Sequence, residues 1–303
     1  MDDPEARRRT ATVEAPLPVP DAAMATLLAH LTDLHVLAPG QLAFDRVDTA
    51  AHLRAAIDAL LALPELPDAV VLTGDLVETG QPAEYEHLAR LLAPLPMPVH
   101  LLPGNHDDRG ALRRVFHSHA TLGTEGFVKY STTVGALRLV ALDTTEPGRS
   151  AGRLCAQRLQ WLDAQLRACR GEPVVIAMHH PPFATGIGEM DRIGLVEGAA
   201  AFASVVARHS HVQRIICGHV HRTMYSTVGG TVASIAPSTA HHVALRLGQD
   251  APALWTLEPP AFHLHRLPDQ GPLVTHVVPV GDFGGARSFD APHALEAPAK
   301  AAT

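Results

Sequence analysis

Five short apolar runs in this chain are each followed at once by acidic, amide or imidazole side chains. The runs alternate with segments in which apolar residues recur at helical spacing, as Leu53, Ile57 and Leu60 do before Pro64. This alternation predicts an α/β fold in which helices cover sheets. From Thr223 onwards only short strands are expected. The sequence therefore predicts an α/β domain with two sheets inside, helices outside and a strand-rich C-terminal part.

The same patterns give the bounds of each expected element. Strands are expected over residues 25–31, 69–73, 98–102, 127–134, 137–142, 174–178, 212–217, 223–228, 231–235, 242–245, 262–267 and 274–278. Helices are expected over residues 48–63, 82–92, 108–117, 154–169 and 197–208. Both ends lack periodicity, so residues 1–23 are predicted to be a disordered leader and residues 282–303 a flexible tail. The folded domain is therefore expected over residues 24–281.

The net charge and the cysteine content limit which binding partners and which cellular compartment are expected. The 24 lysines and arginines are outnumbered by 31 aspartates and glutamates, which gives a net charge of −7. Binding long nucleic acid needs a clustered basic face, so that role is not expected. The three cysteines are widely spaced, and no apolar run reaches the ~18 residues that a membrane span needs. We expect a cytoplasmic protein, with no membrane partner, that forms a homo-oligomer through its strand-rich C-terminal part.

The polar residues after the five apolar runs have the composition of a metal site. They are Asp33 and His35, Asp75, Asn105 and His106, His179 and His180, and His219 and His221. In open α/β sheets, ligands bind beyond the carboxyl ends of the strands, so these side chains are expected in one crevice. Imidazole combined with carboxylate and amide oxygen suits Fe, Mn, Zn or Co better than Ca or Mg. The ligand count is too large for one ion.

The motifs D-x-H, G-D, G-N-H-D, a later H and G-H-x-H occur in this order, each at a predicted strand end. This series resembles the calcineurin-like metallophosphoesterase superfamily, from about residue 24 to residue 281. The segments G-N-H-D-D, H-H-P-P with Met190-Asp191, and Cys217-Gly218-His219 are similar to the bacterial branch of class III cyclic nucleotide phosphodiesterases and glycerophosphodiesterases. The resemblance implies a four-layer αββα sandwich with two mixed sheets.

The resemblance also implies a centre with two divalent metal ions. Asp33, His35 and His221 would bind the first ion, Asn105, His179 and His219 the second, and Asp75 would bridge them. Two divalent ions bring four positive charges, and two ionised aspartates with a bridging hydroxide offset three of them. The one positive charge that remains matches the single negative charge of a phosphodiester. The implied activity is hydrolysis of small phosphodiesters by in-line attack of metal-bound hydroxide. Cyclic nucleotides such as cAMP and glycerophosphodiesters both remain open as substrates.

Three further roles follow from the same resemblance. Asn105 and His106 would contact the phosphate, and His106 is the candidate acid for the leaving alkoxide, oriented by a carboxylate that Asp33 could supply. His241 is similar to a histidine that lies near the substrate in the glycerophosphodiesterase branch. His180 is expected to pack behind the site rather than to bind metal.

Other histidines and one arginine are interpreted as structural. None of the remaining H-x-H pairs follows a glycine at the end of an apolar strand, so these pairs are expected to be solvated, on the surface or in an oligomer contact: His117/His119, His209/His211 and His263/His265. Arg109 is expected on an exposed helix face.

Other functions compete with the phosphodiesterase. A phosphomonoesterase of the protein phosphatase type would carry an arginine in G-D-x-x-D-R-G to clamp a dianion, whereas this chain reads G-D-L-V-E-T-G from Gly74 to Gly80. A nuclease of the same superfamily is disfavoured by the acidic charge. A non-catalytic metal-binding scaffold is expected to have lost ligands, and here every ligand position is filled.

Overall fold

The computed structural model describes residues 25–285, 287 and 289. The predicted leader, residues 1–23, lies outside the described residues, as does most of the predicted tail. Among the described residues, no helix combines the length and the apolar character needed to cross a bilayer.

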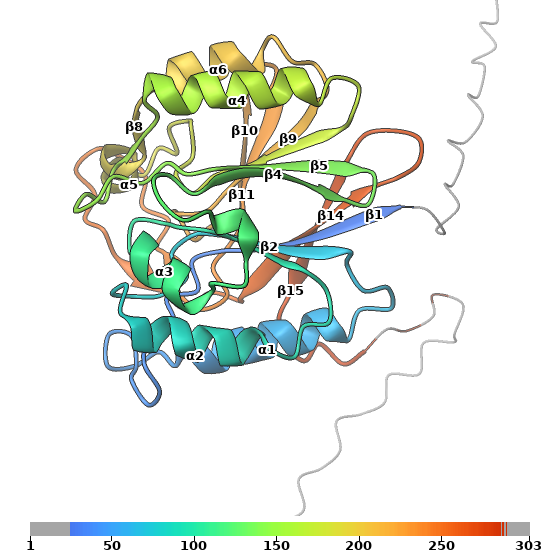
Figure 1. Cartoon of the computed structure of the whole chain (residues 1–303). Coiled ribbons are helices and arrows are strands. Elements are labelled where there is room, and N and C mark those ends of the chain that lie inside the picture. The colour runs from blue at the N-terminus through green and yellow to red at the C-terminus, as the bar shows by residue number, and fades with distance from the viewer. Residues whose placement is uncertain (1–24, 286, 288, 290–303) are drawn as a thin grey trace, which may run out of the picture.

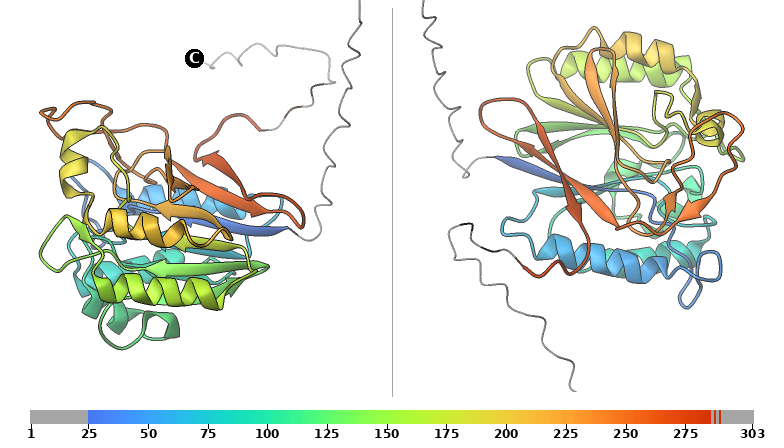
Figure 2. Two further views of the ribbon diagram at one scale, coloured as in Figure 1. Left: turned by 90° about the horizontal axis from the view of Figure 1, so that it is seen from above. Right: turned by 180° about the vertical axis from the view of Figure 1, so that it is seen from behind.

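The first sheet contains five strands and joins the two ends of the described domain. Its order is β15 (Val274–Pro279), β14 (Ala261–Leu267), β1 (Thr26–Leu31), β2 (Ala69–Thr73) and β3 (Val99–Leu102). β1, β2 and β3 are parallel, and β14 and β15 are antiparallel to their neighbours. The views in Figure 2 show the C-terminal strands lying beside β1, so the predicted strand-rich part completes the sheet that the N-terminal strand begins.

The second sheet contains six strands and is also mixed. Its order is β10 (Met224–Val228), β11 (Thr231–Ile235), β9 (Val212–Cys217), β7 (Val174–Ala177), β5 (Leu137–Leu142) and β4 (Lys129–Val134). The four central strands are parallel, and β10 and β4 run antiparallel at the edges.

Helices cover the outer faces of both sheets, which gives four layers (Figure 1). α1 (Thr49–Leu61) and α2 (Pro82–Leu92) cover the first sheet, and α4 (Ala156–Ala168) and α6 (Ala199–Val206) cover the second. The predicted αββα sandwich with two mixed sheets is therefore confirmed. α1 illustrates its local cause: Asp48 caps the helix by accepting a hydrogen bond from Ala51 N at 2.8 Å, and Leu53 and Leu60 are buried on one face.

Several short elements complete the chain. They are α3 (Arg109–Val115), the 3₁₀ turn η2 (Ala120–Leu122), β6 (Gly152–Arg153), α5 (Gly188–Ile193), β8 (Leu195–Glu197), β12 (His242–Val243) and β13 (Trp255–Thr256). α5 lies between β7 and β8, where no helix was expected from the sequence. Its Met190 side chain is buried against the second sheet's core, so part of this segment is packed rather than free to move.

The expected surface position of His263 and His265 is wrong. Both are buried on β14, beside His30 of β1. Their side of the strand faces the second sheet, since the ring of Tyr225 on β10 stacks 6.0 Å from that of His263. The spacing of two residues shows that both histidines lie on one face of the strand. It does not show whether that face packs against the second sheet or faces solvent.

Two further surface predictions are also wrong. His209 is buried and its Nε2 lies 2.9 Å from Asp163 Oδ1 on α4. Arg109 is mostly buried: its Nε lies 2.7 Å from Asp143 Oδ2, and its NH2 donates to Thr145 O at 2.9 Å. Both side chains have tertiary partners that lie far away in the sequence, whereas His117 is exposed as expected.

Candidate metal centre and active site

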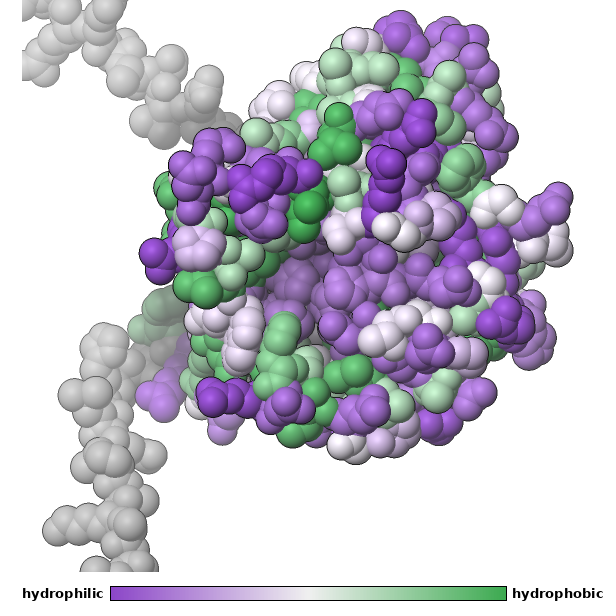
Figure 3. Space-filling model, turned by 90° about the vertical axis from the view of Figure 1, so that its left-hand side faces the viewer, coloured by the Kyte–Doolittle hydropathy of each residue, from purple (hydrophilic) through white to green (hydrophobic). Residues whose placement is uncertain are grey.

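The predicted site residues meet at the edge of the sandwich where parallel strands of both sheets end. The loops are joined by hydrogen bonds: Asp33 N donates to Gly74 O at 3.0 Å, and His219 N donates to the Asp33 carboxylate at 2.9 Å. Figure 3 looks onto this side of the molecule and shows a hydrophilic hollow between its upper and lower parts. The carboxyl-end rule therefore placed the crevice on the correct side of the fold.

The backbone at the site is held in an unusual conformation. Seven non-glycine residues among those described have positive φ, and five of them are predicted metal ligands: Asp33, His35, Asp75, His219 and His221, with φ of 46° to 74°. Such left-handed residues cost free energy and persist where the surrounding structure fixes them. At these residues the chain turns sharply after each strand, so that their side chains point back into the crevice.

Two motif glycines are explained by close packing. A Cβ atom on Gly104 would collide with the backbone and carboxylate of Asp75, and Gly74, with φ of 105°, lies against His179 Nδ1 and Gly104. No larger residue fits between these loops. The glycines of G-D and G-N-H-D therefore permit the close approach of the loops that follow β2 and β3.

One group of candidate ligands contains Asp33, His35, Asp75 and His221. Their ligand atoms lie within 4.8 Å of one another. His35 Nε2 is 3.2 Å from His221 Nε2 and 3.7 Å from Asp75 Oδ2, and His221 Nε2 is 3.5 Å from Asp33 Oδ1. All four side chains are buried.

A second group contains Asn105, His179, His219 and the same Asp75. Asn105 Oδ1 lies 3.1 Å from His179 Nε2 and 3.0 Å from His219 Nδ1, and His179 Nε2 is 3.4 Å from Asp75 Oδ2. Asn105 is the only asparagine in the chain. Asp75 belongs to both groups, which is the position expected of a bridging residue.

The hydrogen bonds of the histidines fix which nitrogen faces the crevice. His179 Nδ1 donates to Thr73 O at 2.9 Å and His221 Nδ1 donates to His241 O at 2.9 Å, because a carbonyl can only accept. His35 Nδ1 likewise donates to Glu78 Oε2 at 2.7 Å. In the neutral rings, Nε2 then carries a lone pair, and the lone pairs converge with carboxylate and amide oxygens. This donor set fits divalent transition-metal ions.

Burial and mutual charge perturb the acidities of these groups. Burial raises the pKa of Asp33 to about 6. Burial acts to lower the pKa of His179, but the Asp75 carboxylate outweighs it and raises that pKa to about 9. Burial and the neighbouring His179 lower the pKa of His219 to about 3. Without a cation the protons are therefore shared among carboxylate and imidazole pairs, so a metal ion that binds here must displace protons.

His106 lies beside the two groups and is partly exposed. Its Nδ1 donates to Glu78 O at 2.7 Å, which leaves Nε2 free to face the crevice. The carboxylate beside His106 is that of Glu78, whose Oε1 is 3.9 Å from His106 Nδ1, rather than that of Asp33. Asp33 is instead occupied by the backbone amide of His219 and lies next to His221.

His180 and His241 differ in their relation to the site. Both ring nitrogens of His180 are engaged, Nδ1 with Thr144 Oγ1 at 2.8 Å and Nε2 with Ser150 O at 2.9 Å, which agrees with the expected packing role. The ring of His241 lies 5.1 Å from that of His35 and 4.7 Å from that of His221. The segment after β11 therefore brings His241 against the first group.

Glu78 is the site residue that sequence reasoning missed. Its carboxylate holds His35 and its carbonyl holds His106. It follows Asp75 by three residues in the same loop after a strand. The available signal was the presence of an acidic residue in that loop, but the sequence could not show that the loop turns Glu78 back towards two histidines.

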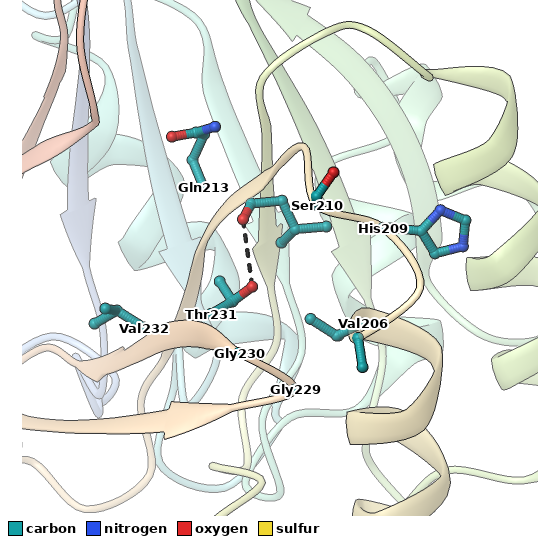
Figure 4. Close-up of a pocket in the computed structure, with 10 residues that line it drawn as sticks. Val206, His209, Ser210, Gln213, Gly229, Gly230, Thr231 and Val232 are labelled. Carbon is teal, nitrogen blue, oxygen red and sulfur yellow. Dashed lines mark hydrogen bonds between the residues drawn. The ribbon is translucent and has the colours of Figure 1, made fainter.

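Two hollows on the surface differ in how they lie relative to the site. One of about 190 Å³ opens beside Asn105 and is also lined by Arg109 and Thr145. Another, of about 440 Å³, lies at the opposite end of β9, where Gly229 and Gly230 form the turn between β10 and β11 (Figure 4). In it, Thr231 Oγ1 donates to Val212 O at 3.3 Å, and His209 turns away towards Asp163. None of the predicted site residues lines this second hollow.

Comparisons with known proteins agree with this geometry. The profile of the family described as calcineurin-like phosphoesterase matches residues 26–223. The chain is 32% identical over 263 residues to a probable glycerophosphodiester phosphodiesterase, GpdQ, of Arcobacter nitrofigilis, covering 87% of this chain and 96% of the relative. It is 34% identical over 218 residues to a probable cyclic nucleotide phosphodiesterase of a Synechococcus strain, covering 72% and 82%. A dimetal phosphatase from Danio rerio shares the fold, with a TM-score of 0.61, 18% identity and coverage of 85% and 97%.

Proposed function

The chain belongs to the calcineurin-like phosphoesterase family, and on that premise we propose that it is a metal-dependent phosphodiesterase that hydrolyses small phosphodiesters. The observation that carries the proposal is the convergence of imidazole nitrogens with carboxylate and amide oxygens around Asp75. His35 Nε2 and His221 Nε2 face each other at 3.2 Å although both rings donate through Nδ1 elsewhere. Without a metal ion a proton lies between these two nitrogens, and a cation bound between them would replace it, so the arrangement fits a metal site.

The assignment of ligands follows the two groups. The first ion would be held by Asp33, His35 and His221, the second by Asn105, His179 and His219, with Asp75 shared. Two divalent ions bound there would lower the pKa of a water molecule and offset the charge of the phosphodiester. Nitrogen and oxygen ligands of this kind suit Fe, Mn, Zn or Co, and we propose iron or manganese among these.

The side chains around the ions would orient the ester and supply a proton. Asn105 lies between the second group and the hollow beside it, where its amide can donate to a phosphate oxygen. His106 presents Nε2 to the crevice while Glu78 O holds Nδ1. A proton on Nε2 would pass to the leaving alkoxide, so His106 would act as general acid. His241, packed against His35 and His221, would line the substrate side of the first group.

A diester fits this site better than a monoester. The position at which a protein phosphatase of the superfamily would carry its clamping arginine is Thr79, whose N and Oγ1 both donate to Glu84, at 3.0 and 2.8 Å. No cation is supplied there for the second negative charge of a monoester. Relatives named for glycerophosphodiesters and for cyclic nucleotides are similarly close, so both substrate types are tested together.

The experiment combines metal content with turnover. The protein is stripped, loaded with Fe, Mn, Zn or Co in turn, and assayed with bis(p-nitrophenyl) phosphate, cAMP and a glycerophosphodiester. We expect about two ions bound per chain and hydrolysis of at least one diester. The Asn105→Ala variant should lose at least ~100-fold in kcat/KM, as removal of a ligand that also orients substrate does. Fully loaded protein without diesterase turnover would contradict the proposal. A cytoplasmic location and a homo-oligomeric state remain predictions.

A further inference from the structure

We propose that Phe44 and Trp255 form an aromatic shelf beside the metal centre that binds the planar base of a nucleotide phosphodiester, so that cyclic nucleotides are preferred over glycerophosphodiesters. This inference rests on the proposed function and names the substrate class within it. The shelf is defined as the two rings of Phe44 and Trp255, and neither residue is among the site residues assigned above.

The shelf is joined to the site by an unbroken series of ring contacts. The ring of His241 lies 4.7 Å from that of His221. Phe44 meets His241 edge to face at 5.1 Å, and Trp255 stacks on Phe44 at 4.8 Å with the planes 12° apart. A phosphodiester held at the ligand groups therefore has aromatic surface within reach of its ester substituent.

Both rings of the shelf stay in contact with solvent. Phe44 is 48% exposed and Trp255 is 38% exposed. Large aromatic side chains are normally buried, because each buries much apolar area. Their stacking on each other hides only part of that area, so ring surface remains available to a ligand.

The loop that carries Phe44 is held by backbone hydrogen bonds and by packing of its flanking residues. Ala43 and Val47 exchange backbone hydrogen bonds at 2.9 Å, and both pack against Ala240, next to His241. Phe44 and Asp45 have φ of 52° and 55°, a conformation that is rare for a bulky residue and costs free energy. The fold thus holds Phe44 outward at the mouth of the site although the neighbouring Ala43 and Val47 are buried.

Trp255 is fixed in the same way from the other side. It pairs with Val243 in the small ladder of β12 and β13, and β12 begins directly after His241. The ends of the shelf are therefore tied to the same segment, Ala240 to Val243, that supplies His241. Pre-positioned rings lose little entropy on binding, so such a surface favours a flat, rigid partner such as a nucleobase over the flexible glycerol group.

The test compares two substrates in matched variants. Phe44→Ala and Trp255→Ala are assayed with cAMP and with glycerophosphoethanolamine, and Leu254→Ala, which removes an exposed apolar side chain next to Trp255, serves as control. We expect KM for cAMP to rise about tenfold with kcat little changed, and the constants for glycerophosphoethanolamine to stay within about twofold. Phe44→Trp, which keeps an aromatic ring at this position, should keep the KM for cAMP close to that of the wild-type protein. Equal losses for both substrates, or none, would overturn the shelf.

A binding measurement separates failure of the shelf from failure of the proposed function. Calorimetry with the metal-loaded protein compares adenosine monophosphate and glycerol 3-phosphate, with Trp255→Ala alongside. If the wild-type protein hydrolyses neither diester, the proposed phosphodiesterase is wrong. The shelf then stands only if adenosine monophosphate binds more tightly than glycerol 3-phosphate and Trp255→Ala removes that difference, and it is overturned if both ligands bind equally.

Discussion

Glu78 Oε2 accepts a hydrogen bond from His35 Nδ1 at 2.7 Å, while the carbonyl of the same glutamate accepts one from His106 Nδ1, also at 2.7 Å. One residue therefore fixes the ring orientation of a candidate metal ligand and of the candidate general acid. The two contacts use different parts of Glu78, so a side-chain substitution affects His35 directly and leaves the His106 contact with the backbone in place.

Replacing Glu78 with glutamine should weaken metal binding more than it slows a fully loaded enzyme. The amide of the variant is a poorer acceptor for His35 Nδ1–H, and loss of such an outer partner costs about 10–100-fold in metal affinity. Activity measured against metal concentration checks this, with the exposed Glu86→Gln on α2 as control. An unchanged metal dependence would show that the contact between His35 and Glu78 has no role in ligation.

Replacing His106 with asparagine should slow the reaction according to the leaving group. The loss should reach about 100-fold or more for an alkoxide leaving group, which needs a proton, and should be much smaller for p-nitrophenolate, which leaves without one. His106 belongs to neither ligand group, and its ring donates to Glu78 O rather than to a ligand. The metal content of the variant should therefore be unchanged. Steady-state kinetics with both substrate types and metal analysis test this, and a uniform loss would exclude an acid role.

Replacing Arg109 with alanine should destabilise the fold. Asp143 is fully buried, and the variant removes its bidentate partner, leaving the carboxylate with hydrogen bonds from Val128 N and Thr145 only. The expected loss in the free energy of unfolding is about 2–4 kcal/mol. Urea denaturation measures it. The exposed Arg114→Ala on the same helix should change stability by less than ~0.5 kcal/mol, and equal effects of both substitutions would contradict the buried pair.

The buried trio of His30, His263 and His265 should make the protein sensitive to acid. Burial lowers the pKa of all three, with His263 at about 4, and Arg214 opposes protonation of His263 and His265. The folded state therefore binds fewer protons than the unfolded state, whose histidine pKa is about 6.5. Stability is retained above that pH and falls as the pH drops from about 6.5 towards 4.

Unfolding free energies at pH 7.5 and 5.5 test this for His263. The loss between the two pH values should be smaller by about 1 kcal/mol in His263→Gln than in the wild-type protein. The exposed His276→Gln on β15 should leave the loss unchanged. The same pH dependence in all three proteins would show that His263 does not titrate as its burial predicts.

Several residues could be placed from sequence because their position depends on strand ends. Asp33, Asp75 and His179 each follow an apolar run, and parallel strands bring their carboxyl ends to one edge. Arg109 and His209 could not be placed, since each is buried by a carboxylate distant in sequence, Asp143 or Asp163. A charged residue on a helix surface gives no sign of such a partner.

The sequence by itself determined an α/β class with two sheets between helices and a set of polar residues at strand ends, because hydrophobic periodicity and post-strand motifs are local properties of the chain. The four-layer sandwich and the ligand assignment came from the family that those motifs resemble. Only the tertiary structure decided that Glu78 holds two histidines, that His263 and His265 face the second sheet, and that Phe44 stacks on Trp255. Those contacts join loops and sheets that are far apart along the chain. They depend on how the two sheets pack and on how left-handed turns aim side chains, which no local pattern encodes.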